Sequence, residues 1–106
     1  MKRVETIKKR EEFNNIIKKG SFIKNEYYII YIMKSENENS KYGIAISNKI
    51  GKAHLRNKLK RQTRTLIDKY RKLFKKYTNY IIMIRKSCAE ADYNTKEIAF
   101  KALIEK

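Results

Sequence analysis

The stretch that decides the fold of this chain is KIGKAHLRNKLKRQTRTLIDKYRKLFKK, residues 49–76. It contains twelve Lys and Arg residues and one acid, Asp68, and so carries +11 of the formal +16 of the whole chain. The other 78 residues supply only the remaining +5. A local concentration of cations this large indicates a polyanionic partner, most simply nucleic acid.

The same stretch has the periodicity of a helix with two different sides. At about 100° per residue, one stripe of side chains faces a core; it comprises Leu55, Leu59, Gln62, Leu66, Tyr70, Leu73 and Tyr77. An adjoining face carries Arg56, Asn57, Lys60 and Arg64, with Arg61 further round. We therefore predict a long helix over residues 52–76 that packs by one side and presents cations on the other.

The segments before this helix predict a helix followed by strands. Phe13, Ile16 and Ile17 recur at helical spacing before Gly20, which predicts a helix over residues 10–19. Residues 22–33 are rich in aromatic and β-branched side chains, and residues 27–32 indicate a strand. A polar loop over 34–41 leads to a second strand over 42–47, and its length favours a hairpin between the two. Residues 1–9 lack periodicity and predict a mobile arm.

The segments after the long helix predict one more strand and one more helix. The apolar run over 80–85 is typical of a strand buried on both faces. Asn94 is the predicted N-cap of a helix over 95–106, with Glu97 completing a capping box and Tyr93 meeting Ile98 in a hydrophobic staple. The order is α-β-β-α-β-α, an α+β fold in which helices cover a small mixed sheet. We expect a single RNA-binding domain over residues 1–106.

Composition excludes several classes of protein. One cysteine, Cys88, and one histidine, His54, cannot form a zinc-finger type of metal site, so we expect no metal bound by the protein. The acids form no evident catalytic pair, and no glycine-rich phosphate loop is present, so we expect no catalytic residue and no small-molecule substrate. No apolar run is long enough to cross a membrane, and no signal peptide is visible, so we expect a cytoplasmic protein with no membrane partner.

Aromatic and basic residues alternate in the first half of the chain. On a strand, Tyr27, Ile29 and Tyr31 project to one face, and Tyr28 and Ile30 to the other. One face must form the core. The second face could stack the bases of a single strand, or a helix could cover it, and the pattern alone leaves both interpretations open.

The run KAHLRNKLKRQTR, residues 52–64, resembles the signature of the bacterial ribonuclease P protein component. The family's Arg-Asn-Arg core corresponds to Arg56-Asn57-Lys58, followed by Lys60-Arg61 and Arg64. The lead-in SNKIG, residues 47–51, is similar to the family's Ser-Lys-Lys-Ile-Gly, and residues 12–20 resemble its first helix. Two positions depart from the family: Lys58 lacks the planar fork of arginine, and Asn48 replaces a lysine.

The resemblance implies a fold and a function that composition does not supply. The implied fold is a two-layer α+β sandwich similar to the second domain of a small-subunit ribosomal protein, with a left-handed β-α-β crossover. The implied function is that of the protein subunit of ribonuclease P, which assists endonucleolytic removal of the 5′ leader from precursor tRNA. The chemistry belongs to the RNA subunit and its Mg²⁺, so no cofactor is expected in the protein.

The resemblance also assigns residues to two sites and names two partners, the catalytic RNA and precursor tRNA. The positions implied to bind the catalytic RNA are Lys49, Lys52, Arg56, Asn57, Lys58, Lys60, Arg61 and Arg64. The positions implied to line a cleft for the leader are Phe13, Ile17 and Tyr31. Three other functions compete with this one: a ribosomal protein or RNA chaperone, a protein-only nuclease, and a helix at a membrane surface. The missing acid cluster disfavours the second, and the polar face around Asn57 disfavours the third.

Overall fold

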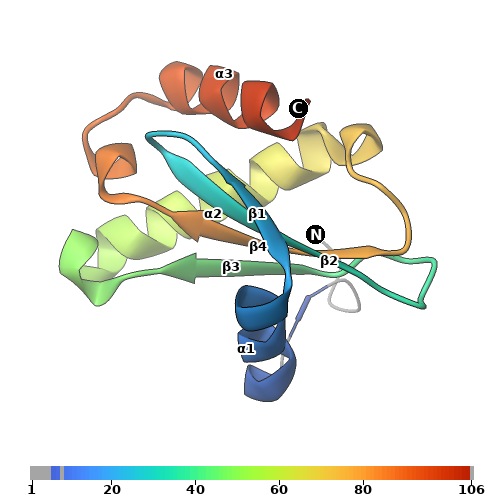
Figure 1. The fold of residues 1–106 in the computed structure, drawn as a ribbon. Helices are drawn as coiled ribbons and strands as arrows, with labels where there is room; N and C mark the ends of the chain where they lie inside the picture. Colours follow the sequence, from blue (N-terminus) through green and yellow to red (C-terminus); the bar gives the residue numbers. More distant parts are fainter. Residues whose placement is uncertain (1–5, 8, 106) are drawn as a thin grey trace.

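The computed structural model describes residues 6–7 and 9–105 (Figure 1). Its helices are α1 (Arg10–Lys19), α2 (Ala53–Lys69) and α3 (Tyr93–Ile104), and its strands are β1 (Ser21–Lys24), β2 (Tyr28–Lys34), β3 (Tyr42–Ile46) and β4 (Thr78–Ile84). Short 3-10 turns are η2 (Asn48–Ile50), η3 (Arg71–Leu73) and η4 (Lys86–Ala89). The predicted α+β class and element order are confirmed, with β1 as an additional strand.

The strands form one sheet in the order β1-β2-β4-β3. The prediction of a hairpin between β2 and β3 is wrong, because β4 lies between them, antiparallel to β2 and parallel to β3. The hairpin forms instead between β1 and β2. Its turn is fixed by the side-chain oxygen of Asn25, which accepts hydrogen bonds from the amides of Tyr27 and Tyr28, both at 2.9 Å. The left-handed course of the β3-α2-β4 connection stays a prediction.

The central strand β4 contributes to two cores, one on each face of the sheet. Tyr80, Ile82 and Ile84 belong to the larger core, which α2 and α3 cover. Ile81, between them in sequence, projects to the other face and packs with Ile16 of α1. Figure 1 shows α2 and α3 on one side of the sheet and α1 on the other. The predicted burial of this strand on both faces is confirmed.

Helix α2 packs by a stripe that differs at its end from the predicted one. Its fully buried residues are Leu59, Thr63, Leu66 and Ile67. The helix ends at Lys69 rather than near residue 76, because the chain turns at Tyr70 into η3. Leu73 is consequently 42% exposed, and Phe74 enters the core instead.

Helix α1 passes directly into β1 at Gly20. The amide of Gly20 donates a hydrogen bond to the carbonyl of Ile16 at 2.9 Å, which ends the helix at the predicted residue. A Cβ atom at Gly20 would lie 2.6 Å from the carbonyl oxygens of both Ile16 and Ile32. Only glycine therefore fits where α1 meets the sheet.

The predicted capping of the last helix is wrong. Asp92, not Asn94, is the N-cap of α3, and its carboxylate accepts a hydrogen bond from the Thr95 amide at 2.7 Å. Glu97 makes no capping box, because it accepts hydrogen bonds from Lys69 Nζ at the end of α2 and from the hydroxyl of Tyr70, which follows that helix. The staple also fails, since Ile98 is 63% exposed. Helix α3 is thus tied to α2 by Glu97.

The predicted N-terminal arm needs correction at Thr6 and Ile7. Thr6 bridges Tyr42 in parallel, and the amide of Ile7 donates to the Tyr42 carbonyl at 3.0 Å. The Ile7 side chain is buried with Ile16 and Ile81 beneath α1. Residues 1–5 and 8 of the predicted arm lie outside the described residues.

The Asp92 cap gives the stability of α3 a pH dependence. The hydrogen bond from the Thr95 amide lowers the pKa of Asp92 below its ordinary value of 3.8. A carboxylate with a lowered pKa stabilises the fold above the pKa of the unfolded chain, and this contribution is lost as pH falls through the folded pKa. Asparagine caps equally well and does not titrate there.

We therefore expect D92N to match the wild type near neutral pH and to become relatively more stable as pH falls from about 5 to about 2. Urea unfolding midpoints at each pH measure the difference, with N94A as the control variant that leaves the cap intact. A constant difference between wild type and D92N over this range would contradict the assignment of Asp92 as the cap.

Candidate nucleic-acid interface

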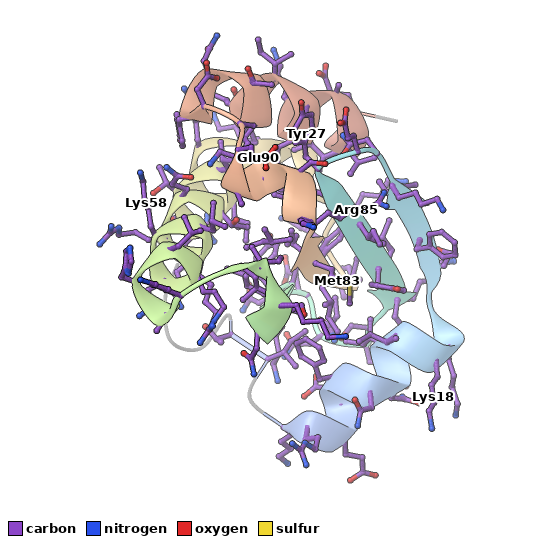
Figure 2. All side chains as sticks on the ribbon, turned by 90° about the vertical axis from the view of Figure 1, so that its left-hand side faces the viewer. Lys18, Tyr27, Lys58, Met83, Arg85 and Glu90 are labelled. Carbon is purple, nitrogen blue, oxygen red and sulfur yellow. The ribbon has the colours of Figure 1, made fainter. Side chains whose placement is uncertain are left out.

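The outward side of α2 and its lead-in forms a surface that we call the cationic face. Six of the eight predicted RNA-binding positions are exposed on it: Lys49, Lys52, Asn57, Lys58, Arg61 and Arg64. Arg56 and Lys60 are half-buried at its border. Figure 2 shows Lys58 projecting away from the body of the molecule. The structure therefore brings all eight positions together on or beside one side of the helix.

The cationic face is held by burial of the opposite side of α2. Leu59, Leu66 and Ile67 pack into the larger core against the sheet and α3, which fixes the rotation of the helix about its axis. The hydroxyl of buried Thr63 donates to the Leu59 carbonyl at 2.9 Å, one turn earlier in the helix. The first turn of α2 contains no acid, so the positive end of the helix dipole adds to the field of the cations.

Arg56 has a structural role that its charge did not reveal. Its Nη1 donates hydrogen bonds to the carbonyl of Gly51 at 2.7 Å and to that of Asn48 at 3.4 Å. These bonds hold the lead-in segment against the first turn of α2. The lead-in is also ordered locally, because the Ser47 hydroxyl accepts from the Lys49 amide at 3.2 Å. Arg56 therefore positions Lys49 relative to the cationic face.

The three predicted cleft residues come together beneath α1. Phe13, Ile17 and Tyr31 are all partly buried against Ile16 and Ile81. Phe13 lies directly over Gly43, where a Cβ atom would come within 3.0 Å of its ring. The side chains of α1 and β2 therefore meet at one end of this sheet face.

Helix α1 covers only part of that sheet face, and the remainder is a groove of about 580 Å³. We call it the sheet groove; its lining includes Ile29, Ala45, Ile46, Lys49, Ile50 and Met83. Ile29 and Met83 are register partners, two residues along from the Tyr31–Ile81 pair. The groove adjoins the predicted cleft, because Ala45 lines the groove and also packs with Ile81, and it reaches Lys49 of the cationic face.

Most of the groove lining was missed in the sequence. Ala45 and Met83 lie on the face opposite to Ile82 and Ile84, and the alternation of side chains along a strand would have found them once the pairing of β3 with β4 was known. The two rows predicted on this strand divide between the faces except at Tyr27, which precedes β2 and packs against the larger core instead of sharing a face with Tyr31. Tyr28 and Ile30 enter the larger core, and Tyr31 projects toward α1.

The remaining reactive side chains serve the core. Lys96 is buried and donates to the Gln62 side-chain oxygen at 2.6 Å, and burial lowers its pKa. The Cys88 thiol is buried and donates to the Tyr27 carbonyl at 3.0 Å, and burial raises its pKa. A thiol of this kind is unreactive at neutral pH. Within residues 6–7 and 9–105, no group of three or more His, Cys, Asp or Glu side chains has the arrangement of a metal site.

The cationic face, beside a mainly apolar groove and a cleft that contains Phe13 and Tyr31, has the features of a small nucleic-acid-binding protein. Comparison with known proteins makes the class specific. The family model described as Ribonuclease P matches residues 1–106. The ribonuclease P protein component of Bacillus cereus (strain AH187) is 35% identical over 94 residues, covering 88% of this chain and 82% of that protein. The chain therefore belongs to the ribonuclease P protein family.

Solved structures of this family have the same fold. The RNase P protein from Thermotoga maritima is 30% identical, with a TM-score of 0.86 over 95% of this chain and 96% of that one. The Staphylococcus aureus RNase P protein is 25% identical, with a TM-score of 0.88 over 95% and 93% of the two chains. Membership gives the chain a role in tRNA 5′ processing as part of an endoribonuclease. No helix among the described residues is long and apolar enough to cross a membrane.

The hydrogen bonds of Arg56 predict a stability effect that the exposed arginines lack. We expect R56A to lower the free energy of unfolding by about 1–3 kcal/mol, because two carbonyls lose a charged donor. The control R61A removes an exposed guanidinium, and we expect it to change stability by no more than about 0.5 kcal/mol. Urea unfolding measures both. Equal stabilities of R56A and R61A would contradict the structural role of Arg56.

Proposed function

We propose that this chain binds the catalytic RNA of ribonuclease P through the cationic face and holds the 5′ leader of precursor tRNA in the cleft of Phe13, Ile17 and Tyr31 and in the adjoining sheet groove. The observation that carries the proposal is the division of α2 into two sides. One side is buried against the sheet, and the other presents Arg61 and Arg64 with Asn57 to solvent. No ion pair or hydrogen bond within the described part of the chain occupies the guanidinium groups of Arg61 and Arg64. These groups are available for phosphates.

The charge of this surface suits a folded RNA. An arginine guanidinium can donate two parallel hydrogen bonds to one phosphate. The neighbouring lysines add positive charge without a fixed hydrogen-bond geometry. Each neutralised phosphate releases counterions, so binding weakens steeply with salt. Asn57 lies among these cations and contributes hydrogen bonds that fix the register of the RNA on the helix.

The sheet groove suits a single strand of variable sequence. Tyr31 and Phe13 offer ring surfaces in the adjoining cleft, and Lys49 offers a cation in the groove lining. Stacking on an aromatic ring contributes about 1–3 kcal/mol per base and tolerates any base. Such a site binds leaders of different sequences, as a protein that serves many precursors requires.

We assign the chemistry to the RNA subunit and its Mg²⁺. Three carboxylates of the described residues have structural roles: Asp92 caps α3, Asp68 pairs with Arg71, and Glu97 joins α3 to α2. Acids held in such contacts are poorly placed to activate a water molecule. The chain's contribution is to reduce repulsion between two RNAs, which lowers the Mg²⁺ concentration that the holoenzyme needs. We propose that the chain performs this function in the cytoplasm.

Reconstitution with the catalytic RNA at low Mg²⁺ tests the proposal. We expect the wild-type protein to stimulate 5′ cleavage of precursor tRNA and to cleave nothing by itself. Failure to stimulate would contradict the proposal, whereas cleavage by the protein alone would place catalytic residues in this chain. Binding of RNA without stimulation would favour a ribosomal protein or an RNA chaperone.

The proposal that the cleft and the sheet groove bind the leader makes a separate prediction for Tyr31. We expect Y31A to weaken binding of the holoenzyme to precursor tRNA about fivefold or more, because one stacked base is lost. Binding of mature tRNA, which has no leader, should stay unchanged. Y31F keeps the ring and is the matched control. Equal losses of affinity for precursor and mature tRNA in Y31A would contradict the proposal that this part of the protein binds the leader.

A further inference from the structure

Phe22 is an exposed aromatic residue that the sites described above do not use. It lies on β1, and 56% of its surface is exposed. The other exposed large hydrophobic residues of the described chain, Leu73, Tyr77 and Ile98, belong to the α2–β4 connection or to α3. Single exposed apolar side chains are common and need no explanation. Phe22 is different because its ring contacts Tyr31 of the predicted cleft.

The sheet register sets this contact. Phe22 is the partner of Tyr31 across the β1–β2 ladder, and Tyr31 is in turn the partner of Ile81 on β4. The rings of Phe22 and Tyr31 lie with their centroids 5.9 Å apart and their planes tilted by 48°. Tyr31 packs on the α1 side of the sheet, so Phe22 projects to that side as well. The aromatic surface of the cleft therefore continues onto β1.

Phe22 lies at the far end of this sheet face from the cationic face. Strand β3 leads into Lys49 and α2, whereas β1 is the strand at the opposite edge. With about 4.8 Å between neighbouring strands, the four strands span roughly 14 Å. A strand of RNA that crosses the sheet from Lys49 meets Met83 and Ile29 first, then Tyr31, and Phe22 last. Figure 2 shows Met83 on the sheet, with α1 and Lys18 below it in this view.

The charges near Phe22 suit a nucleic acid rather than another protein core. Lys24 follows two residues later, so it projects to the same face, and it is exposed. Arg85 reaches the end of the same strand, where its Nη1 donates to the Asn25 carbonyl at 2.7 Å. Strand β1 itself, Ser21–Lys24, contains no acid. An aromatic ring with cations beside it is the arrangement that stacks a base while neutralising its phosphate.

We propose that Phe22 is an outer stacking position that binds a leader base farther from the cleavage site than the base at Tyr31. This proposal rests on the proposed function, because it extends the groove assigned to the leader. It gives this chain a longer leader-binding surface than Phe13, Ile17 and Tyr31 alone provide. Precursors with long leaders are then bound more tightly than precursors with leaders that stop at Tyr31.

The test uses the reconstituted holoenzyme and a series of precursor tRNAs whose leaders are shortened one nucleotide at a time. With long leaders, we expect F22A to weaken binding about fivefold or more, the range found for loss of one stacked base. The effect should vanish once the leader is shorter than a threshold length. The Y31A effect should persist to leaders that are shorter by at least one nucleotide.

Two variants separate stacking from other roles of Phe22. F22W keeps an aromatic ring and should restore binding, whereas F22L keeps only apolar bulk and should not. The control I98A removes an exposed apolar side chain on the other side of the sheet and should leave binding unchanged at every leader length. Urea unfolding of F22A confirms that the variant is folded, because an exposed side chain contributes little to stability.

Three results would overturn the proposal. Equal weakening by F22A at all leader lengths would mean that Phe22 only supports Tyr31. Wild-type binding of long leaders by F22A would mean that Phe22 touches no base. Self-association of the wild-type chain that F22A abolishes would assign Phe22 to a protein interface. A wild-type holoenzyme with no dependence on leader length would instead contradict the proposed function itself.

Discussion

The burial of Leu59, Leu66 and Ile67 against the sheet is the constraint on which the surfaces of this protein depend. A helix has no preferred rotation about its own axis until one side is removed from water, and burying each large aliphatic side chain contributes about 1.5–3 kcal/mol. Once that side is fixed, Arg61 and Arg64 must face outward. The position of the cationic face is therefore a consequence of packing, and not of any attraction among the cations, which repel one another.

Strand β4 connects the packing of α2 to the groove side of the sheet. Its odd and even residues face opposite sides of the sheet, so Ile82 supports α2 while Ile81 supports α1. The lead-in to α2 connects the same two regions along the chain. Arg56 holds the lead-in against the helix, and Lys49 lines the groove. The surface proposed for the catalytic RNA and the one proposed for the leader thus share a single rigid frame.

Much of the fold could be predicted from the sequence, since the strongest signals are local and periodic. The basic helix, the apolar strand after it and the first helix were all recognised by spacing. The errors arose where a non-local contact decides between local alternatives. Pairing of β4 between β2 and β3 joins residues that are 44–56 positions apart on β2 and 38 apart on β3. Glu97 binds Lys69 on another helix and therefore does not complete the predicted capping box.

The candidate site, like the fold, could be predicted from the sequence only in part. The positions of the cationic face followed from the phase of one helix and from a family resemblance. The sheet groove could not be predicted, because Ala45 and Met83 face it only through the order of the strands. Phe22 entered the prediction only as the first residue of the aromatic-rich segment 22–33. Its place beside Tyr31 required the β1–β2 register, since the sequence did not separate β1 from β2.

The salt dependence of binding to the catalytic RNA tests the central claim most directly. A double variant, R61A/R64A, removes two charges from the cationic face, and K34A/K101A removes two exposed lysines outside it. The slope of log binding constant against log salt should become shallower by about 1.4–1.8 for R61A/R64A, at 0.7–0.9 per phosphate contact. It should stay near the wild-type value for K34A/K101A. Equal slopes for the two double variants would contradict the account, because they would show that net charge, and not the orientation of α2, binds the RNA.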